Sequence, residues 1–408
     1  MIALDLSRLL SRAGRGTPTG IDRVELAYAE HLIAGDRPSC FTALTASGRL
    51  GLLPQQAVEQ LVAAIGAEWR GTLDPLADRQ VRQIARQIRI ALLGSGQRAL
   101  LSRLRSDAAR PVYLLVSHHH LERQSLIARL KERAGARFVC LIHDLIPIEF
   151  PEYAKPGQAE HHLRRIETAA RFADAVIVNS ATTRDALQPH LKRAGRSPPV
   201  LVAAFGADLP AAPGDSGPPP FERPYFVYVS TIEARKNHIL LLNLWRWLAT
   251  DLAERAPLLV LVGQRGWETE NVVDMLERCP ALRGAVVEHN SLPDAEMVRL
   301  LKGARALLLP SFAEGFGFPL IEGLELGVPA LCSDIAALHE TGGSVPEFFN
   351  PLDGPGWREA ILDYALPRSP RREAQLARLA TWQPPRWEDH FAVVDRFIAE
   401  VAARPVEA

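Results

Sequence analysis

The sequence predicts an α/β protein made of two doubly wound halves. Short apolar runs followed by turn residues alternate with longer segments of helical period, which is the pattern of parallel strands covered by helices. A proline-rich stretch in the middle of the chain separates two series of such runs. The length of 408 residues fits this division, because domains usually contain roughly 100 to 200 residues.

The strand candidates are apolar runs that end in turn residues. In the first half they are 2–6, 112–116, 138–142, 175–178 and 200–203, and in the second half they are 225–229, 258–262, 285–288, 306–309 and 330–332. Helical period marks 76–104, 239–250 and 387–403. The last of these helices carries its apolar residues on one face, so we expect it to dock onto a neighbouring surface.

The domain boundary is predicted at 210–224, where six of fifteen residues are proline. Proline blocks both helix interiors and central strands, so this stretch is either a linker or a long surface loop within one domain. A strand candidate that begins directly after it favours the linker. The predicted organisation is a first domain at 1–208, a linker at 209–224, a second domain at 225–385 and a C-terminal helical segment at 386–408.

Charge and composition narrow the classes of partner. The 47 Lys and Arg balance the 47 Asp and Glu, so the chain lacks the overall positive charge that favours nucleic-acid binding. Eight arginines nevertheless lie between Arg79 and Arg110 against one acidic residue, Asp107. We interpret this stretch, which includes Arg79 to Arg105, as a solvated helix face or as a contact with an anionic membrane.

The same composition gives expectations about location and metal content. The four cysteines have no metal-ligand spacing, and no apolar run reaches the ~20 residues of a membrane helix. The N-terminus lacks the basic lead and long apolar run of a secretory signal. We therefore expect a cytoplasmic protein without a metal, with attachment to the inner membrane surface left open.

The most informative stretch is 306–330, which combines a buried strand, a glycine-rich turn and a helix with Pro319 in its first turn. In open α/β sheets, ligands bind beyond the carboxyl ends of the strands, where this turn must lie. Gly315 and Gly317 allow the backbone to approach a ligand, and the following helix directs its partially positive end towards it. The turn is therefore expected to bind an anion such as a diphosphate.

Two carboxylates, Glu314 and Glu322, bracket this turn. Carboxylates repel phosphate but accept hydrogen bonds from sugar and ribose hydroxyls, so the ligand should carry both groups. The alternative is that Glu314 is a solvent-exposed loop residue and that Glu322 is a first-turn acid favoured by the helix dipole.

A basic pair, Arg235 and Lys236, follows the first strand of the second half and precedes a helix. Arginine and lysine together are a usual combination for binding diphosphate. Because the helix dipole disfavours cations at this end, something negative should compensate for their charge.

Polar residues also follow two strands of the first half. His143 and Asp144 could bind hydroxyls or exchange a proton, although an isolated histidine is more often structural, and the run 118–120 of three histidines is expected to line a crevice. The segment from Gly14 to Gly20 is predicted to be a flexible turn before a helix, similar to a substrate loop. Neither a dinucleotide-binding fingerprint nor a Gly-Lys-Ser/Thr motif occurs, so nicotinamide and ATP chemistry lose support.

Six stretches together resemble the retaining nucleotide-sugar glycosyltransferases of family 4. They are Thr19-Gly-Ile-Asp-Arg-Val, Ile142-His-Asp-Leu-Ile-Pro, Ala175-Val-Ile-Val-Asn-Ser, Glu233-Ala-Arg-Lys-Asn, Leu261-Val-Gly and Pro310-Ser-Phe-Ala-Glu-Gly-Phe-Gly-Phe-Pro-Leu-Ile-Glu. The resemblance implies the GT-B fold, with two facing Rossmann-like domains, parallel sheets and a deep interdomain crevice. It also implies that the C-terminal helix crosses back to the first domain.

The resemblance assigns roles to the candidate residues. Arg235 and Lys236 would hold the donor diphosphate, Glu314 would contact the transferred sugar, and Glu322 would accept from the ribose. The remaining donor contacts would come from Gly315, Phe316, Gly317 and Phe318 and from loops at 263–267 and 287–292, including Leu292. His143 would lie beside the donor sugar and complete a catalytic set with Glu314, Arg235 and Lys236, and Gly20, Ile21 and Asp144 would face the acceptor.

The activity implied by the resemblance is transfer of a hexose, with retention at the anomeric carbon, to a hydroxyl of a glycan or lipid-linked glycan. The leaving diphosphate would help to deprotonate the acceptor, no metal or cofactor would be required, and GDP-mannose is slightly favoured as the donor. A bacterial mannosyltransferase of surface-polysaccharide assembly fits these features. The alternatives are a sugar-nucleotide epimerase, a phosphorylase on the same fold, or a non-catalytic glycan-binding scaffold.

Overall fold

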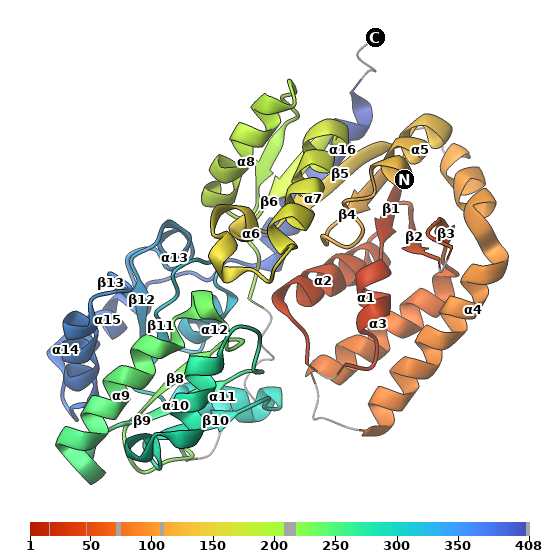
Figure 1. The fold of residues 1–408 in the computed structure, drawn as a ribbon. Helices are drawn as coiled ribbons and strands as arrows, with labels where there is room; N and C mark the ends of the chain where they lie inside the picture. Colours follow the sequence, from red (N-terminus) through yellow and green to blue (C-terminus); the bar gives the residue numbers. More distant parts are fainter. Residues whose placement is uncertain (16, 46, 71–74, 107–109, 208–217, 405–408) are drawn as a thin grey trace. The chain divides into compact units, whose positions relative to one another are not determined.

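The structure is a computed structural model that describes residues 1–15, 17–45, 47–70, 75–106, 110–207 and 218–404. The chain divides into two units, each with its own sheet (Figure 1). Unit 1 contains Met1–Ile148, Gly157–Gly206 and Arg386–Ala408, and unit 2 contains Glu149–Pro156 and Ala207–Pro385. Most of the predicted linker at 209–224 lies outside the described residues.

Unit 1 has a seven-stranded sheet in the order β3-β2-β1-β4-β5-β6-β7. Its strands are β1 (Ile2–Asp5), β2 (Ser39–Leu44), β3 (Leu50–Leu52), β4 (Val112–Leu115), β5 (Arg137–Ile142), β6 (Ala175–Val178) and β7 (Val200–Val202). The sheet is parallel as predicted, except at one edge, where β3 pairs with β2 in the antiparallel direction. The short connection between β2 and β3 explains this, since a parallel crossover needs a dozen or more residues.

The helices of unit 1 cover this sheet (Figure 1). They are α1 (Ser7–Arg12), α2 (Gly20–Ala34), α3 (Gln55–Arg70), α4 (Pro75–Arg105), α5 (Gln124–Ala134), α6 (Ile146–Glu149, which ends at the first residue of unit 2), α7 (Gln158–Phe172), α8 (Ala181–Arg193) and α16 (Trp387–Ala403). Helix α4 consists of two helical segments that meet at Gly96, whose φ of 54° is not helical.

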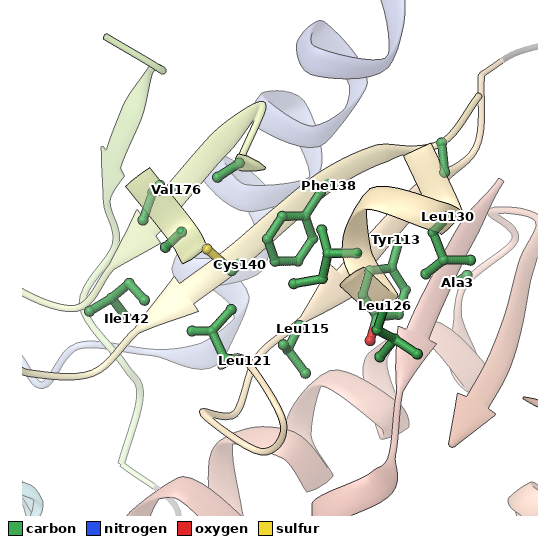
Figure 2. Close-up of a cluster of buried hydrophobic side chains, with 14 of the residues drawn as sticks. Ala3, Tyr113, Leu115, Leu121, Leu126, Leu130, Phe138, Cys140, Ile142 and Val176 are labelled. Carbon is green, nitrogen blue, oxygen red and sulfur yellow. The ribbon is translucent and has the colours of Figure 1, made fainter. Parts of the chain in front are cut away.

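The core of unit 1 follows from the alternation of side chains along its buried strands. Phe138, Cys140 and Ile142 of β5 point to one cluster, which Figure 2 shows together with Leu121 from the turn after β4 and Leu126 of α5. These side chains are at most 8% exposed. The strands β1, β4, β5 and β6 are buried on both faces, which is why each appears in the sequence as a continuous apolar run.

The C-terminal helix α16 packs on unit 1. The Phe391 ring stacks on His31 with 3.9 Å between ring centroids, and the Tyr28 hydroxyl lies 2.8 Å from Nε2 of His390. The apolar face predicted for this helix is buried, since Val394 and Ile398 are 1% and 3% exposed. The last helix thus belongs to the unit built mainly from the first half of the chain.

Unit 2 has a six-stranded parallel sheet in the order β10-β9-β8-β11-β12-β13. Its strands are β8 (Tyr225–Val229), β9 (Leu258–Val262), β10 (Val286–His289), β11 (Ala306–Leu309), β12 (Ala330–Ser333) and β13 (Glu347–Phe349). Its helices are α9 (His238–Leu252), α10 (Glu270–Arg278), α11 (Asp294–Gly303), α12 (Phe318–Glu325), α13 (Ala336–Gly342), α14 (Gly354–Ala365) and α15 (Pro370–Leu379). Single-turn 3-10 helices are η1 (Pro151–Tyr153), η2 (Ala234–Lys236), η3 (Ala253–Arg255) and η4 (Pro280–Leu282).

Candidate functional site

The candidate site of unit 2 lies where β8 and β11 end side by side in the sheet. The segments that follow these two strands meet because the amide of Phe312 donates to the carbonyl of Arg235 at 2.8 Å. Asn237, in the left-handed conformation with φ 56°, donates from Nδ2 to the carbonyls of Pro310 and Pro351. Sheet topology and these backbone contacts therefore fix the basic pair beside the glycine-rich turn.

Four charged side chains form the centre of this site. Lys236 Nζ lies 2.5 Å from Glu314 Oε1, and Arg235 Nη1 lies 3.3 Å from Glu314 Oε2. Arg235 also reaches Glu233, with 2.7 Å between Nη2 and Oε1. The side chains of Glu233, Lys236 and Glu314 are only 4%, 10% and 7% exposed. Two cations and two carboxylates thus neutralise each other in a largely buried cluster, which we call the charge cluster.

The charge cluster explains the protonation of its members. Burial opposes ionisation of Glu314, but Lys236 and then Arg235 stabilise the carboxylate and bring its pKa down to about 2. Burial lowers the pKa of Lys236, and Arg235 adds to this effect, while Glu314 opposes it. Glu314 is therefore ionised at neutral pH, and the alternative of a solvent-exposed loop acid is wrong.

Three residues of the site were not singled out from the sequence. Glu233 compensates for Arg235 at the helix entrance, Ser311 donates from Oγ to Glu314 Oε1 at 2.7 Å, and the Tyr228 hydroxyl donates to the carbonyl of Lys236 at 2.7 Å. The expected negative partner of the basic pair is thus supplied by the protein itself. Glu233 was visible as the acid two residues before Arg235, whereas nothing in the sequence distinguished Ser311 or Tyr228.

The glycine-rich turn has the predicted strand-turn-helix form. Gly317 adopts a φ of 89°, and a Cβ there would lie 2.8 Å from a methyl group of Leu338, so both backbone conformation and space require glycine. The helix α12 begins at Phe318 and contains Pro319 in its first turn, as predicted. Glu322 is half-buried and lies one residue beyond the first turn, so the interpretation of it as a first-turn acid is wrong.

The other donor-side candidates occupy different surroundings. Phe316 is buried, and its carbonyl accepts from the Thr341 hydroxyl at 2.5 Å. Gly263 directly follows β9, and its backbone lies close to Ser230, which directly follows β8. A Cβ at Gly263 would lie 1.9 Å from the carbonyl oxygen of Ser230. Leu292 follows β10 and packs partly buried against the core of unit 2. These loops all leave the carboxyl ends of parallel strands, where ligands of such sheets bind.

Unit 2 also contains the short segment Glu149–Pro156, which follows the candidate histidine motif along the chain. The ring of Tyr153 stacks on Phe312 with 5.6 Å between centroids and 10° between planes. Trp267 donates from Nε1 to the carbonyl of Tyr153 at 3.3 Å, and Lys155 lies over the Trp267 ring. This segment is therefore bound to two loops that carry donor-side candidates.

In unit 1, His143 and Asp144 follow β5 as predicted, but their side chains bind backbone groups. His143 Nε2 lies 2.8 Å from the carbonyl of Val116, and the carboxylate of Asp144 accepts from the amide of Ile146 at 3.2 Å. Burial lowers the pKa of His143 to about 4, so the ring is neutral at pH 7. These contacts do not favour direct proton exchange between the side chains of His143 and Asp144.

The histidine run that we expected to line a crevice is largely buried. His118 and His120 are 7% and 4% exposed, and only His119 among the three is partly accessible. His118 Nε2 accepts from the amide of His143 at 3.2 Å, and His120 Nε2 lies 3.1 Å from the Tyr113 hydroxyl. The prediction of a lining role is therefore wrong for His118 and His120, because they bind neighbouring polar groups within the fold.

Gly20 and Ile21 are the first two residues of α2. Thr19 and Asp22 form a capping box, in which the Thr19 hydroxyl accepts from the Asp22 amide and the Asp22 carboxylate accepts from the Thr19 amide at 2.7 Å. The described part of the preceding loop is likewise bound by side chains. Trp69 and Arg82 donate to the carbonyls of Arg15 and Gly14 in this turn, and its flexibility stays a prediction.

Several arginines of the arginine-rich helix bind other groups of unit 1. Arg89 and Arg105 donate to backbone carbonyls at 2.6 and 2.7 Å, and Arg82 binds both Asp78 and the carbonyl of Gly14. Arg79 and Arg86 are exposed on the same helix. All seven arginines from Arg79 to Arg105 are nevertheless exposed, so the solvated basic face predicted from sequence is present.

The described residues contain neither a candidate metal centre nor a candidate membrane-spanning helix. Over residues 1–15, 17–45, 47–70, 75–106, 110–207 and 218–404, no group of three or more His, Cys, Asp or Glu is arranged to hold a metal ion. Within the same described part of the chain, each helix is too short or too polar to cross a membrane.

Two family profiles match the chain. Residues 215–342 match the family described as "Glycosyl transferases group 1", and residues 117–191 match "Glucosyltransferase 3-like, N-terminal domain". The first match covers β8 to α13, including the charge cluster and the glycine-rich turn. The second covers the part of unit 1 that carries His143 and Asp144.

Curated relatives are similar over part of the chain. "O-antigen chain mannosyltransferase B" of Escherichia coli is 27% identical over 259 residues, which cover 62% of this chain and 68% of the relative. "Serotype-specific mannosyltransferase WbdA" of Escherichia coli is 28% identical over 224 residues, which cover 51% of this chain and 27% of the relative. The matched region thus spans about two thirds of the first protein and about a quarter of the second.

Solved structures share the fold over nearly the whole chain. A sucrose-phosphate synthase from Thermosynechococcus elongatus has a TM-score of 0.63 at 16% identity, covering 98% of this chain and 99% of that one. Anabaena HepE in complex with UDP has a TM-score of 0.63 at 15% identity, with coverage of 98% and 99%. Together with the two doubly wound sheets, this similarity shows that the chain has a fold of the GT-B type.

Proposed function

We propose that this protein is a retaining mannosyltransferase. It transfers mannose from a nucleotide-diphosphate sugar, with GDP-mannose favoured, to a hydroxyl of a glycan or lipid-linked glycan during surface-polysaccharide assembly. The single observation that carries the proposal is the charge cluster, in which Arg235 and Lys236 are held beside Glu314 at the strand ends of unit 2. The printed names of the curated relatives support mannose as the sugar.

The chemistry of the charge cluster suits a sugar diphosphate. Arg235 and Lys236 offer a planar fork and a compact ammonium group to the diphosphate, and they stabilise the negative charge that develops on it as the glycosidic bond breaks. The Glu314 carboxylate accepts from hydroxyls of the transferred sugar, and Glu322 accepts from the ribose. Positive charge from the protein takes the place of a metal ion in this proposal.

Retention follows if the acceptor hydroxyl attacks from the face that the diphosphate leaves. The departing diphosphate oxygen accepts the acceptor proton, so the protein mainly positions the reactants and stabilises charge. His143 contributes a neutral ring in this scheme. Because its Nε2 must donate to the Val116 carbonyl, which only accepts, Nδ1 of the neutral ring is left as the acceptor for a sugar hydroxyl.

The test combines a donor panel with product stereochemistry. The purified protein is incubated with GDP-mannose, UDP-glucose, UDP-N-acetylglucosamine and ADP-glucose and with mannose-terminated oligosaccharide acceptors, and NMR identifies the anomeric configuration of any product. We expect transfer from GDP-mannose with an α-linked product, and loss of at least about a hundredfold in rate in Lys236→Met. Inversion at the anomeric carbon, preference for another sugar, or full activity in the variant would each contradict the proposal.

We also propose that the protein associates with anionic membrane surfaces through α4. Ile90 and Leu93 are 59% and 74% exposed on this helix, and the exposed Arg79 and Arg86 lie on the same segment. Exposed apolar side chains flanked by arginines are typical of helices that lie in the membrane interface. This face would bring the enzyme to a lipid-linked acceptor.

Sedimentation with vesicles tests this association. At low salt, the protein should sediment with vesicles that contain phosphatidylglycerol but not with vesicles of phosphatidylcholine alone. The double variant Arg79→Glu/Arg86→Glu should remain in the supernatant, whereas reversal of an arginine elsewhere on unit 1, such as Arg193→Glu, should not. Equal sedimentation of wild type and the double variant would exclude α4 as the contact.

A further inference from the structure

The loop between α1 and α2 is held in place by the helical hairpin that α3 and α4 form. We call residues 13–19 the glycine loop, of which residue 16 lies outside the described residues. The three contacts are Trp69 Nε1 to the Arg15 carbonyl at 3.1 Å, Arg82 Nη2 to the Gly14 carbonyl at 3.1 Å, and Arg89 Nη2 to the Leu10 carbonyl at 2.6 Å. The hairpin thus binds the backbone at the glycine loop and at the end of α1 just before it.

The contact between Arg82 and Gly14 is steric as well as polar. Gly14 has a φ of 78°, and a Cβ at this position would lie 2.3 Å from Cγ of Arg82. Arg82 is itself fixed by Asp78, whose Oδ2 lies 2.6 Å from Nη2. The side chain of Arg82 therefore lies flat against the loop backbone, which requires glycine at residue 14.

The other side of the loop is bound to α2. Arg8 and Arg12 both contact the fully buried carboxylate of Asp22, at 2.7 and 3.0 Å, and Arg12 Nη2 also donates to the carbonyl of Thr17 at 3.2 Å. Thr19 caps the same helix. The hairpin on one side and Asp22 on the other leave the described loop backbone little freedom.

The hairpin is rigid enough to act as a support. Val81, Ile88 and Leu92 of α4 are at most 3% exposed, and Leu92 packs so closely on Gly51 of β3 that a Cβ there would lie 2.9 Å from its methyl carbon. Along α4, Arg82 and Arg89, which bind the loop region, directly follow Val81 and Ile88, which are buried and anchor the helix.

We infer that the α3–α4 hairpin positions the glycine loop for the acceptor, with Arg82 and Arg89 as positioning residues. The inference rests on the proposed function and on the expectation from the family resemblance that Gly20 and Ile21, which directly follow this loop, face the acceptor. A loop fixed through its carbonyl groups presents those residues in one geometry, so the entropy of ordering the loop is not lost at each acceptor-binding event. The arginine-rich helix thereby acts on acceptor recognition through the backbone of the glycine loop.

The experiment compares Arg82→Met and Arg89→Met with Arg129→Met, an equal loss of charge at an exposed position of α5 in the same unit. Hydrogen exchange of the peptide that covers residues 9–15 is measured together with the KM for acceptor, the KM for donor and the affinity for GDP. In the first two variants we expect exchange of this peptide to accelerate by about tenfold to a hundredfold, the range for loss of a hydrogen bond from a charged donor. We expect the acceptor KM to rise by at least about tenfold, with donor KM and GDP affinity unchanged, and partial recovery in Arg89→Lys.

Each other outcome overturns the inference. If Arg82→Met and Arg89→Met exchange no faster than Arg129→Met, the hairpin does not hold the loop. If exchange accelerates but the acceptor KM stays the same, or if donor and acceptor constants change equally, the contacts do not serve acceptor recognition. If the wild-type protein transfers no sugar, the proposed function fails, and hydrogen exchange alone decides whether the hairpin positions the loop.

Discussion

Replacement of Glu314 by glutamine should separate nucleotide binding from sugar transfer. In the structure, Glu314 Oε1 lies 2.5 Å from Lys236 Nζ, and Glu314 Oε2 lies 3.3 Å from Arg235 Nη1. Glutamine keeps the shape of the side chain and can still accept from the Ser311 hydroxyl, which lies 2.7 Å from Glu314 Oε1. The substitution therefore removes one negative charge from the charge cluster with little change in packing.

The expected size of both effects follows from the contacts of Glu314 that the substitution changes. The four charges of the cluster cancel in the wild type, and Glu314→Gln leaves one net positive charge for the diphosphate. The amide oxygen at the Oε1 position can still accept from Lys236, so the contact that is lost is the one between Arg235 and Oε2. A hydrogen bond to a charged group contributes about 1.5–3 kcal/mol, so loss of this contact should tighten GDP binding by about tenfold to a hundredfold. Sugar transfer should fall by at least about a hundredfold, equivalent to about 2.7 kcal/mol, because the proposed acceptor for the sugar hydroxyls is lost.

Titration calorimetry with GDP and a transfer assay with GDP-mannose measure the two effects. Glu296→Gln, an exposed residue of α11, provides the same change of charge outside the charge cluster and should leave both quantities unchanged. A folded Glu314→Gln protein that binds GDP more weakly than wild type would refute the reasoning that this carboxylate competes with the diphosphate. Unchanged transfer would refute its proposed contact with the sugar.

Three further predictions concern stability. Burial raises the pKa of Glu25 from 4.5 to about 8, so the folded protein keeps this carboxyl protonated over a pH range in which the unfolded chain has lost the proton. The free energy of unfolding should therefore fall by on the order of 5 kcal/mol at most as the pH rises from about 4.5 to about 8. Denaturant titrations should show a flatter dependence of this free energy on pH in Glu25→Gln. Gly206→Ala should lower the free energy of unfolding by about 1–3 kcal/mol, because the new Cβ would lie 2.4 Å from the backbone nitrogen of Trp387; an unchanged urea midpoint would contradict the contact. Tyr153→Ala should lower the free energy of unfolding by about 0.5–1.5 kcal/mol through loss of the ring stack on Phe312, in addition to the effect of the lost buried area. Tyr153→Phe should retain the contribution of the stack.

The central strands could be predicted because parallel strands buried on both faces are continuous apolar runs. The strands β6, β8, β9 and β11 have the predicted bounds. Three strands at or next to a sheet edge, β2, β3 and β13, gave no such signal, whereas the edge strands β7 and β10 were predicted. Strand β2 contains Ser39 and Thr42 among its apolar residues, and β3 and β13 have only three residues each. Their pairing depends on neighbours that a local pattern does not contain.

The residues of the site could be predicted from the sequence, but the contacts between them could not. Arg235, Lys236 and Glu314 were recognisable because each follows a strand. Their contact joins residues 78 and 79 positions apart, and it exists because β8 and β11 are neighbours in the sheet. The sequence likewise showed a basic helix, but which of its arginines bind the glycine loop depends on where that loop folds.

The neutrality of the charge cluster has a consequence for ligand selection. An empty site with two unpaired buried cations would be strongly destabilising, and Glu233 and Glu314 remove that penalty. A diphosphate that takes Lys236 leaves the Glu314 carboxylate, whose side chain is only 7% exposed, without its closest partner. A donor that also carries sugar hydroxyls restores that partner, because hydroxyls donate to a carboxylate. The wild type should therefore discriminate a nucleotide sugar from the free nucleotide diphosphate more strongly than Glu314→Gln does.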